Sequence, residues 1–277
     1  MITLISIELY KIFRKWRSYI GFIAITLLIL LVETAMYFEG SGFLNAQLRG
    51  LDSFVFTGNL LNGYLIAYFV MGALVIHIPF LITLVAGDLL AGEATAGTYR
   101  MLITRPISRF KLVTAKFLSG LTYTFLLIIW LAVLSLGLGL FIFGSGELIV
   151  VQKSIIIFAK DDIIWRFILA YIFAALSMSV VASLAFLFSS LVENAIGPII
   201  TTMAIVIVFI ILSAINIDFF RDIRPYLFTT YMMDWRLFFD SPLDKEEIVK
   251  AVLFLFAHVA GLYFLTLFLF KRKDILS

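Results

Sequence analysis

The densest polar run of the chain lies between two long apolar segments and reads GDLLAGEATAGTYRMLITRPISR, from Gly87 to Arg109. It holds two acids, Asp88 and Glu93, in a zone where basic residues are otherwise favoured. Three glycines allow tight turns or close approach of backbones; they are Gly87, Gly92 and Gly97. Such a concentration of shape-setting residues in one connection indicates a binding element.

The second half of this run predicts a short amphipathic helix, TYRMLITR. Thr98 can cap its start, and Pro106 ends it because the residue before a proline is disfavoured in the α conformation. Ser108 can cap the helix that follows. The predicted helix has an apolar edge and basic neighbours; they are Tyr99, Leu102 and Ile103, with Arg105 and Arg109. A short helix held between glycines and a proline is suited to dock another protein.

The chain carries none of the common signatures of catalysis. It has no Gly-Lys dipeptide for a P-loop, and no HExxH or GxSxG motif. It has no cysteine, and its two histidines, His77 and His258, are too few for a histidine-built metal site. We therefore expect no enzymatic activity, no metal site and no cofactor in this chain, and any ATP must be bound by another chain.

Two ionisable residues fall within apolar segments. Glu33 could line a path or take up a proton, or it could be a carboxylate near the membrane interface, about five residues from the expected end of its span. His77, two residues before Pro79, could mark a kinked polar lining or be a hydrogen-bonded packing histidine. The sequence leaves both alternatives open.

The composition identifies an integral membrane protein. The chain has 277 residues, of which 63% are hydrophobic and 14% charged, and its mean hydropathy is +1.11. A soluble domain carries about 25% charged residues. The net charge of +3 is therefore interpreted as an orientation signal in a membrane and not as evidence of nucleic-acid binding.

Long apolar runs predict an all-α fold with six transmembrane helices in a single domain, residues 1–277. Three segments outside the spans are distinct: an N-terminal helix at 1–18, a coupling loop at 87–115 and an outer connection at 216–248. The expected spans are about Tyr19–Phe38, Tyr64–Ala86, Lys116–Phe143, Trp165–Leu191, Ile196–Ile215 and Val249–Phe270.

The distribution of Lys and Arg predicts the orientation of the chain. Most of them fall before the first span, in the 87–115 loop and after the last span, which six spans place on one side. The positive-inside rule puts both termini and the loop in the cytoplasm.

The N-terminal segment reads as an amphipathic helix in the inner headgroup region. A helix that simply continues into the first span is the alternative. Its apolar stripe is Ile5, Leu9, Ile12, Phe13 and Trp16, opposite Lys11, Arg14, Lys15 and Arg17.

The polar run resembles the permease subunits of ABC-2 type ABC transporters. The shared pattern is an acid and Gly-Glu after the second span, then Gly-Thr, a Leu-containing helix and Arg-Pro-Ile-Ser-Arg with a Lys soon after. The matching positions are Asp88, Gly92, Glu93, Gly97, Thr98, Leu102, Arg105, Pro106, Ile107, Ser108, Arg109 and Lys116. The basic N-terminal helix, the six expected spans and the basic C-terminal end extend the resemblance along the whole chain.

The resemblance implies an exporter fold in which two permeases, identical or different, form the pathway within a prokaryotic plasma membrane. Each permease docks a cytoplasmic ATPase, which binds ATP and Mg²⁺, through a coupling helix that corresponds here to Thr98–Arg105. Glu93 and Gly97 would orient that helix, and 106–109 would lead into the third span. The 216–248 connection resembles short outer helices that partly re-enter the bilayer.

Two other functions stay open at this stage. One is a self-sufficient ion-coupled carrier or channel in which Glu33 and His77 titrate. The other is an ABC-type complex that performs mechanical work or signalling without cargo. The nearly uncharged spans favour an amphiphile, a lipid-linked molecule or an apolar peptide over small ions, and the sequence does not identify the cargo.

Overall fold

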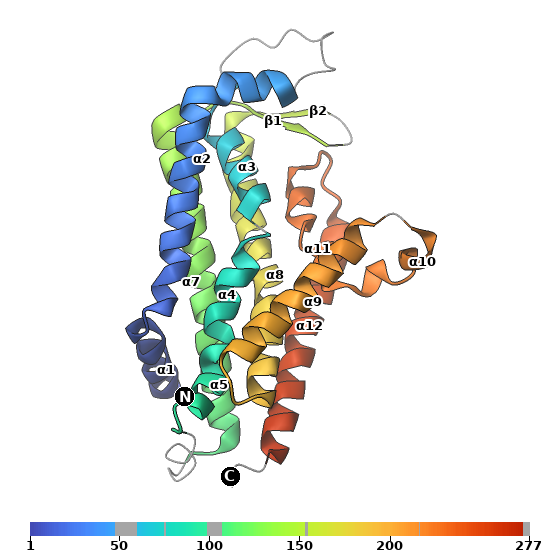
Figure 1. Ribbon diagram of the computed structural model, residues 1–277. Helices are drawn as coiled ribbons and strands as arrows, with labels where there is room; N and C mark the ends of the chain where they lie inside the picture. Colours follow the sequence, from blue (N-terminus) through green and yellow to red (C-terminus); the bar gives the residue numbers. More distant parts are fainter. Residues whose placement is uncertain (48–59, 75, 99–106, 153–154, 216, 274–277) are drawn as a thin grey trace.

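The protein is built from long helices that run side by side (Figure 1). The computed structural model describes residues 1–47, 60–74, 76–98, 107–152, 155–215 and 217–273. Within these ranges five helices are long and apolar enough to cross a membrane, and a bent pair is a sixth candidate span. The five are α2 (Arg17–Gln47), α7 (Arg109–Phe143), α8 (Ile164–Leu191), α9 (Ile196–Ala214) and α12 (Lys245–Arg272).

The second expected span is not one continuous helix. It consists of α3 (Gly63–Leu74) and α4 (Ile78–Ala86), which are bent by 56° relative to each other. Pro79 lies in the first turn of α4. Proline has no backbone N–H and its ring crowds the preceding turn, so it is tolerated at a helix start and disfavoured in a helix interior.

The all-α prediction is wrong at one place, where a β-hairpin lies between α7 and α8. Strand β1 (Leu148–Val151) pairs antiparallel with β2 (Ile155–Phe158), and Leu148 lies opposite Phe158. The runs LIVV and IIIF consist mostly of β-branched residues, which favour strands. A one-turn helix, η1 (Lys160–Asp162), leads from the hairpin into α8.

The connection between α9 and α12 consists of short helices, as expected for 216–248. They are α10 (Asp218–Arg221), η2 (Arg224–Tyr226), α11 (Phe228–Tyr231) and η3 (Asp234–Phe239). Trp235 of η3 is fully buried and packs edge-on against Tyr68 of α3. This packing joins the connection to the helix bundle, and its re-entry into the bilayer stays a prediction.

Helix α8 forms the centre of the bundle. It is buried along most of its length and contacts α4, α7, α9 and α12. Small side chains such as Ala174, Ser177 and Ser183 are buried on it and allow neighbouring helices to approach closely. The helices around α8 leave large apolar side chains exposed, as expected of surfaces that face lipid or another membrane chain.

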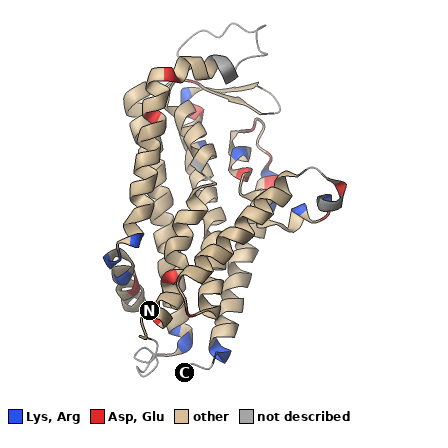
Figure 2. Ribbon diagram, in the orientation of Figure 1, with Lys and Arg blue, Asp and Glu red and all other residues tan. Residues whose placement is uncertain are grey.

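The first residues of the chain and the C-terminal end of α12 lie at the same end of the bundle, which we call the basal end; the hairpin lies at the opposite, apical end (Figure 1). Helices α1 (Ile2–Arg14) and α5 (Asp88–Thr95) are also basal. Figure 2 shows Lys and Arg gathered on α1 and around the basal ends of α7 and α12. The cytoplasmic location of this end stays a prediction from the positive-inside rule.

Candidate functional site

The first part of the polar run forms a helix, α5, that ends in a defined turn. The N–H of Thr98 donates to the carbonyl oxygen of Glu93 at 3.0 Å, and the N–H of Gly97 donates to that of Ala94 at 2.9 Å. Gly97 has a φ of 67°, the left-handed conformation that this type of helix end requires and glycine adopts most easily. The expected turn at Gly97 is therefore present, and it sets the direction in which the chain leaves α5.

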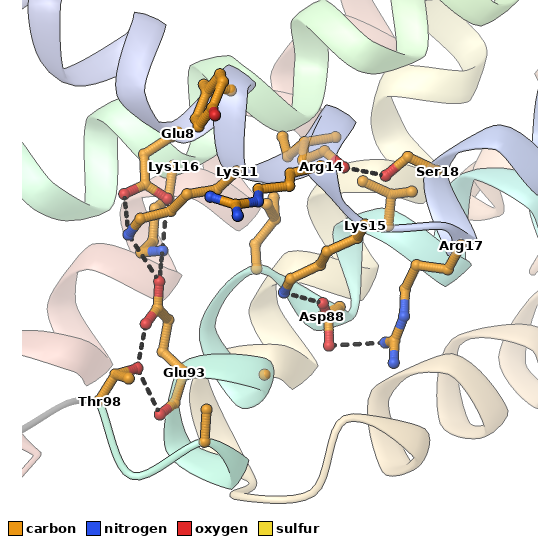
Figure 3. Close-up of a pocket in the computed structure, with 16 residues that line it drawn as sticks. Glu8, Lys11, Arg14, Lys15, Arg17, Ser18, Asp88, Glu93, Thr98 and Lys116 are labelled. Carbon is orange, nitrogen blue, oxygen red and sulfur yellow. Dashed lines mark hydrogen bonds and ion pairs between the residues drawn. The ribbon is translucent and has the colours of Figure 1, made fainter.

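Glu93 on α5 is held by cations from two other helices (Figure 3). Its Oε1 lies 2.9 Å from Nζ of Lys116 on α7 and 3.0 Å from Nζ of Lys11 on α1. The hydroxyl of Thr98 donates to its other carboxylate oxygen. Burial alone would raise the pKa of Glu93, but Lys116, Thr98 and Lys11 outweigh burial and lower it to about 2.

Lys116 is the most buried member of this group, with a side chain that is 2% exposed. Its Nζ also lies 2.7 Å from Oε2 of Glu8 on α1, and Oε1 of Glu8 lies 2.9 Å from Nζ of Lys11. Two glutamates and two lysines thus form a closed, neutral ring that joins α1, α5 and α7. We call Glu8, Lys11, Glu93 and Lys116 the basal ring.

Asp88, at the start of α5, forms ion pairs with basic residues at the junction between α1 and α2. Its carboxylate oxygens lie 2.6 Å from Nζ of Lys15 and 2.7 Å from Nη1 of Arg17. Together with the basal ring, this pairing lines a cavity of about 330 Å³ between α1 and α5. Both acids of the polar run are therefore bound to the N-terminal segment.

Helix α1 is present as expected, but much of its apolar stripe faces protein. Ile12 is buried and its carbonyl oxygen accepts a hydrogen bond from the hydroxyl of Ser18 at 2.6 Å. Leu9 and Phe13 pack against the core, whereas Trp16 is 74% exposed. Lys11 of α1, and Lys15 and Arg17 just after this helix, also bind acids of α5, where the sequence predicted only positive charge. The placement of α1 in the headgroup region stays a prediction.

Helix α5 is also attached to the basal end of α8. The hydroxyl oxygen of Ser189 accepts hydrogen bonds from the N–H groups of Leu90 and Ala91 at 3.0 and 2.9 Å. The hydroxyl of Thr95 donates to the carbonyl oxygen of Glu193 at 2.7 Å. Together with the ion pairs above, these contacts fix α5 to four helices, α1, α2, α7 and α8.

The start of α7 forms as the sequence predicts. The Oγ of Ser108 accepts a hydrogen bond from the N–H of Lys111, so Ser108 caps the helix. Arg109 does something the sequence did not suggest: its guanidinium donates to the carbonyl oxygens of Lys271 and Lys273, at 3.0 and 2.9 Å. An arginine near these terminal carbonyls stabilises the end of α12.

The remaining predicted coupling residues, Tyr99, Leu102, Arg105 and Pro106, lie outside the described residues. The segment predicted to form the helix capped by Thr98 lies outside the described residues as well. The described hydroxyl of Thr98 contacts Glu93, both at its side chain and at its carbonyl oxygen. The predicted coupling helix, Thr98–Arg105, is thus described only at its first residue, and the described chain resumes at residue 107.

The two ionisable residues of the apolar segments, Glu33 and His77, differ in burial and in hydrogen bonding. Glu33 is 1% exposed and lies within α2, with its Oε1 beside Gly139 in the last turns of α7. Both interpretations of Glu33, as part of a path and as a carboxylate near the interface, stay predictions. His77 precedes α4, is exposed, and has Nδ1 2.9 Å from the carbonyl oxygen of Ala73. The structure does not bring the two into contact.

Sequence reasoning missed several residues of the site. Lys11, Lys15 and Arg17 were interpreted by their charge alone, and Glu8 and Ser189 were not considered. One signal was available: Glu8 is the only acid in a basic N-terminal helix, and it precedes Lys11 by three residues, a spacing at which side chains meet.

Comparison with known proteins identifies a family that the chain matches along nearly its whole length. The family model described as "ABC-2 family transporter protein" matches residues 2–275. A protein of Bacillus subtilis (strain 168) named "Uncharacterized protein YhcI" is 29% identical over 118 residues, which cover 40% of this chain and 37% of that protein. The alignment thus spans less than half of that relative.

Proposed function

Because the chain belongs to the ABC-2 transporter family, we propose that it works as the permease subunit of an exporter driven by a separate cytoplasmic ATPase. The chain is a multi-pass membrane protein with the composition and candidate spans of a permease. In this proposal ATP and Mg²⁺ are bound by the ATPase, and the permease converts the movement of its partner into movement of the spans.

One observation carries the proposal: the basal ring lies directly behind the point where the chain enters the 99–106 segment. Thr98 contacts Glu93, and Glu93 binds Lys116 of α7 and Lys11 of α1. An ATPase that docks on this segment would therefore act on a group of buried charges. Because separating a buried charge from its partners is costly, the group should move as one body.

The contacts of α5 indicate which parts would move together. Asp88 couples α5 to the junction of α1 and α2, and Ser189 couples it to α8. A force on the docking segment would thus reach the basal ends of four helices, α1, α2, α7 and α8. In this mechanism Glu93 and Lys116 are positioning residues, because they hold the docking segment and touch neither ATP nor cargo.

We further propose that two permeases associate in a prokaryotic plasma membrane. Helices α9 and α12 leave large apolar side chains exposed, including Ile200, Ile207 and Phe256. These surfaces suit lipid or a second permease, and the basal ring at the predicted cytoplasmic end suits the ATPase. The nearly uncharged spans favour an amphiphilic or apolar cargo.

A second candidate function rests on Glu33. A buried acid within a membrane helix is unusual and points to ion or proton handling. A carrier or channel that works without ATP would use such a residue. An ABC-type complex without cargo would use the basal ring in the same way as an exporter.

The first test is purification of the full chain from its native membrane in mild detergent. The proposal expects an ABC ATPase to copurify and the complex, but not the isolated chain, to hydrolyse ATP. The control is the same purification of a variant that lacks 99–106. Ion flux through the isolated chain in liposomes, without ATP or a partner, would instead support the carrier.

The second test asks whether the basal ring transmits movement. The chain has no cysteine, so paired spin labels can be attached at Ala96→Cys on α5 and Leu118→Cys on α7, both exposed positions. The distance distribution should stay narrow when ATP binds, and it should broaden in Glu93→Gln with loss of ATP-dependent transport.

Glu39→Gln is the matched control, because it makes the same change at an exposed residue of α2. If Glu93→Gln keeps a narrow distribution and full coupling, the basal ring does not position the docking segment.

A further inference from the structure

Glu33 is a buried carboxyl group that has no partner in the described part of the chain. It is 1% exposed, and neither carboxyl oxygen has a hydrogen-bond partner among the described residues. It forms no ion pair there either, unlike Asp88 and Glu93 at the basal end. Buried polar groups are nearly always hydrogen-bonded, so this exception calls for an explanation.

The carboxyl group lies where three helices meet, next to two glycines. A Cβ atom placed on Gly139 of α7 would lie 3.7 Å from Oε1 of Glu33 and 3.1 Å from the carbonyl oxygen of Gly63 on α3. A Cβ atom on Gly63 would lie only 2.4 Å from the backbone of Gly139 and Leu140. The backbones of α3 and α7 thus touch at this level, and we call this contact the glycine seam.

The glycine seam is reinforced at the apical end of α7. The N–H of Gly63 donates to the carbonyl oxygen of Gly144 at 2.9 Å, and Asn62 donates to the carbonyl oxygen of Glu147 at 2.7 Å. The seam therefore closes α3 against α7 beside Glu33. Any separation of these two helices would change the surroundings of the carboxyl group.

The charged groups on the helices that contact α2 lie away from Glu33. Helix α2 contacts α1, α3, α4 and α7. Glu8 and Lys11 of α1 and Lys116 of α7 belong to the basal ring, Tyr10 and Arg14 of α1 are exposed, and α4 itself has no titratable residue. His77, just before α4, is exposed and bound to its own chain.

The remaining titratable groups on these elements also have other neighbours. Tyr64 of α3 stacks on Phe167, and Tyr68 packs on Trp235. Tyr123 of α7 donates to the carbonyl oxygen of Ser18 at the basal end. The others are exposed or basal; they are Arg17, Tyr19, Tyr37 and Glu39 of α2 with Arg109 and Lys111 of α7.

We propose that Glu33 is an intramembrane proton-binding site that the glycine seam controls. With α3 and α7 in contact, no cation or hydrogen-bond donor among the described residues stabilises a carboxylate, so the group holds a proton as a carboxylic acid. When the helices separate and water enters, the O–H bond breaks, the proton passes to water and a hydrated carboxylate forms. The ligand of the site is the proton, and this inference does not depend on the ATPase or the cargo.

The test is infrared spectroscopy of the full chain in liposomes at about pH 8, where an ordinary carboxyl group is ionised. The carbonyl stretching band of a protonated carboxylic acid should be present in the wild-type protein and absent in Glu33→Gln. His77→Gln should keep the band. If the wild-type spectrum contains no band that Glu33→Gln removes, Glu33 is ionised and the proposal is overturned. This holds even if sodium ions bind at Glu33.

The role of the seam is tested in the same spectra. Gly63→Ala should remove more than half of the Glu33 band, because the new methyl group forces α3 away from α7. Gly137→Ala is the matched control, since no atom lies within 4 Å of its added Cβ. If Gly63→Ala does not fold, Gly139→Ala provides a milder displacement at the same contact. An unchanged band in a folded seam variant would contradict control by the seam.

Discussion

Glu93 and Glu33 show how the same side chain has different properties at two places in one membrane protein. Glu93 is 14% exposed and lies among Lys116, Lys11 and Thr98, which hold it as a carboxylate. Glu33 is 1% exposed and has no partner among the described residues. The comparison indicates that neighbours, more than burial alone, decide whether a buried glutamate serves as a charged structural contact or as a site that can exchange a proton.

The difference between the two glutamates also corresponds to two kinds of mechanical contact. At the basal ring, charges join three helices and resist separation. At the glycine seam, backbone contact joins two helices without any charge. A movement that starts at the basal end could therefore shift helices as a body and still open the seam beside Glu33.

The largest expected effect comes from removing the central cation of the basal ring. Lys116→Met would leave Glu8 without its buried lysine and Glu93 without its closest one, so both would keep only the more exposed Lys11 as a lysine partner. Loss of one partner from a buried ion pair costs about 3–5 kcal/mol. We expect a destabilisation of that size in denaturant unfolding of the purified protein in detergent.

Lys111→Met is the matched control for that variant, because Lys111 is exposed on the same helix. It should change the free energy of unfolding by less than about 0.5 kcal/mol. Adding Glu8→Gln to Lys116→Met should restore part of the loss. Equal stability of the Lys116→Met and Lys111→Met proteins would refute the importance of the buried ring.

A smaller effect is expected at the glycine seam. Gly63→Ala places a methyl group on the backbone of Gly139, and overpacking of this kind costs about 1–3 kcal/mol. Gly137→Ala has free space and should be neutral or slightly stabilising, because alanine favours helix more than glycine does. Thermal unfolding of both variants would measure the difference, and equal melting temperatures would contradict the close contact.

The pH dependence of stability should distinguish Glu93 from an ordinary surface acid. Its pKa is lowered from 4.5 to about 2 in the folded protein, so it stabilises the fold above about pH 4.5. This contribution is lost as the pH falls towards about 2. Glu93→Gln should be less stable at neutral pH and should show a shallower loss in acid, whereas Glu39→Gln should keep the wild-type slope.

Asp234 of η3 is a third acid, and its pKa is shifted in the opposite direction to that of Glu93. Burial, together with the nearby negative charge of Glu247, raises its pKa to about 6 from an ordinary 3.8. Its ionisation therefore destabilises the fold as the pH rises from about 3.8, with the full cost present above about pH 6. Asp234→Asn should raise the melting temperature at pH 8 and leave it unchanged at pH 3. An increase of the same size at both values would contradict the shift.

The sequence predicted the long helices because apolar runs of this length are distinctive, and it located Asp88 and Glu93 as unusual acids in a basic zone. It could not predict their partners, because Lys11 and Glu93 are 82 residues apart. It left two interpretations of Glu33 open, because the contact of α3 with α7 beside this residue joins segments that are far apart in the sequence. The hairpin was missed because two strands of four residues are too short to show a period.

The smallest effect is expected where an ion pair of the basal end remains in contact with water. Lys15 binds Asp88 at 2.6 Å, but its side chain is 48% exposed, and Arg17 also binds that carboxylate. Exposed pairs contribute about 0–1 kcal/mol, so Lys15→Met should lower stability by no more than that in the assay used for Lys116→Met. Arg14→Gln, one residue earlier at the end of α1 and without a partner among the described residues, is the control. A loss with Lys15→Met as large as with Lys116→Met would mean that burial does not determine the strength of these pairs, because Lys116 is 2% exposed and Lys15 is 48% exposed.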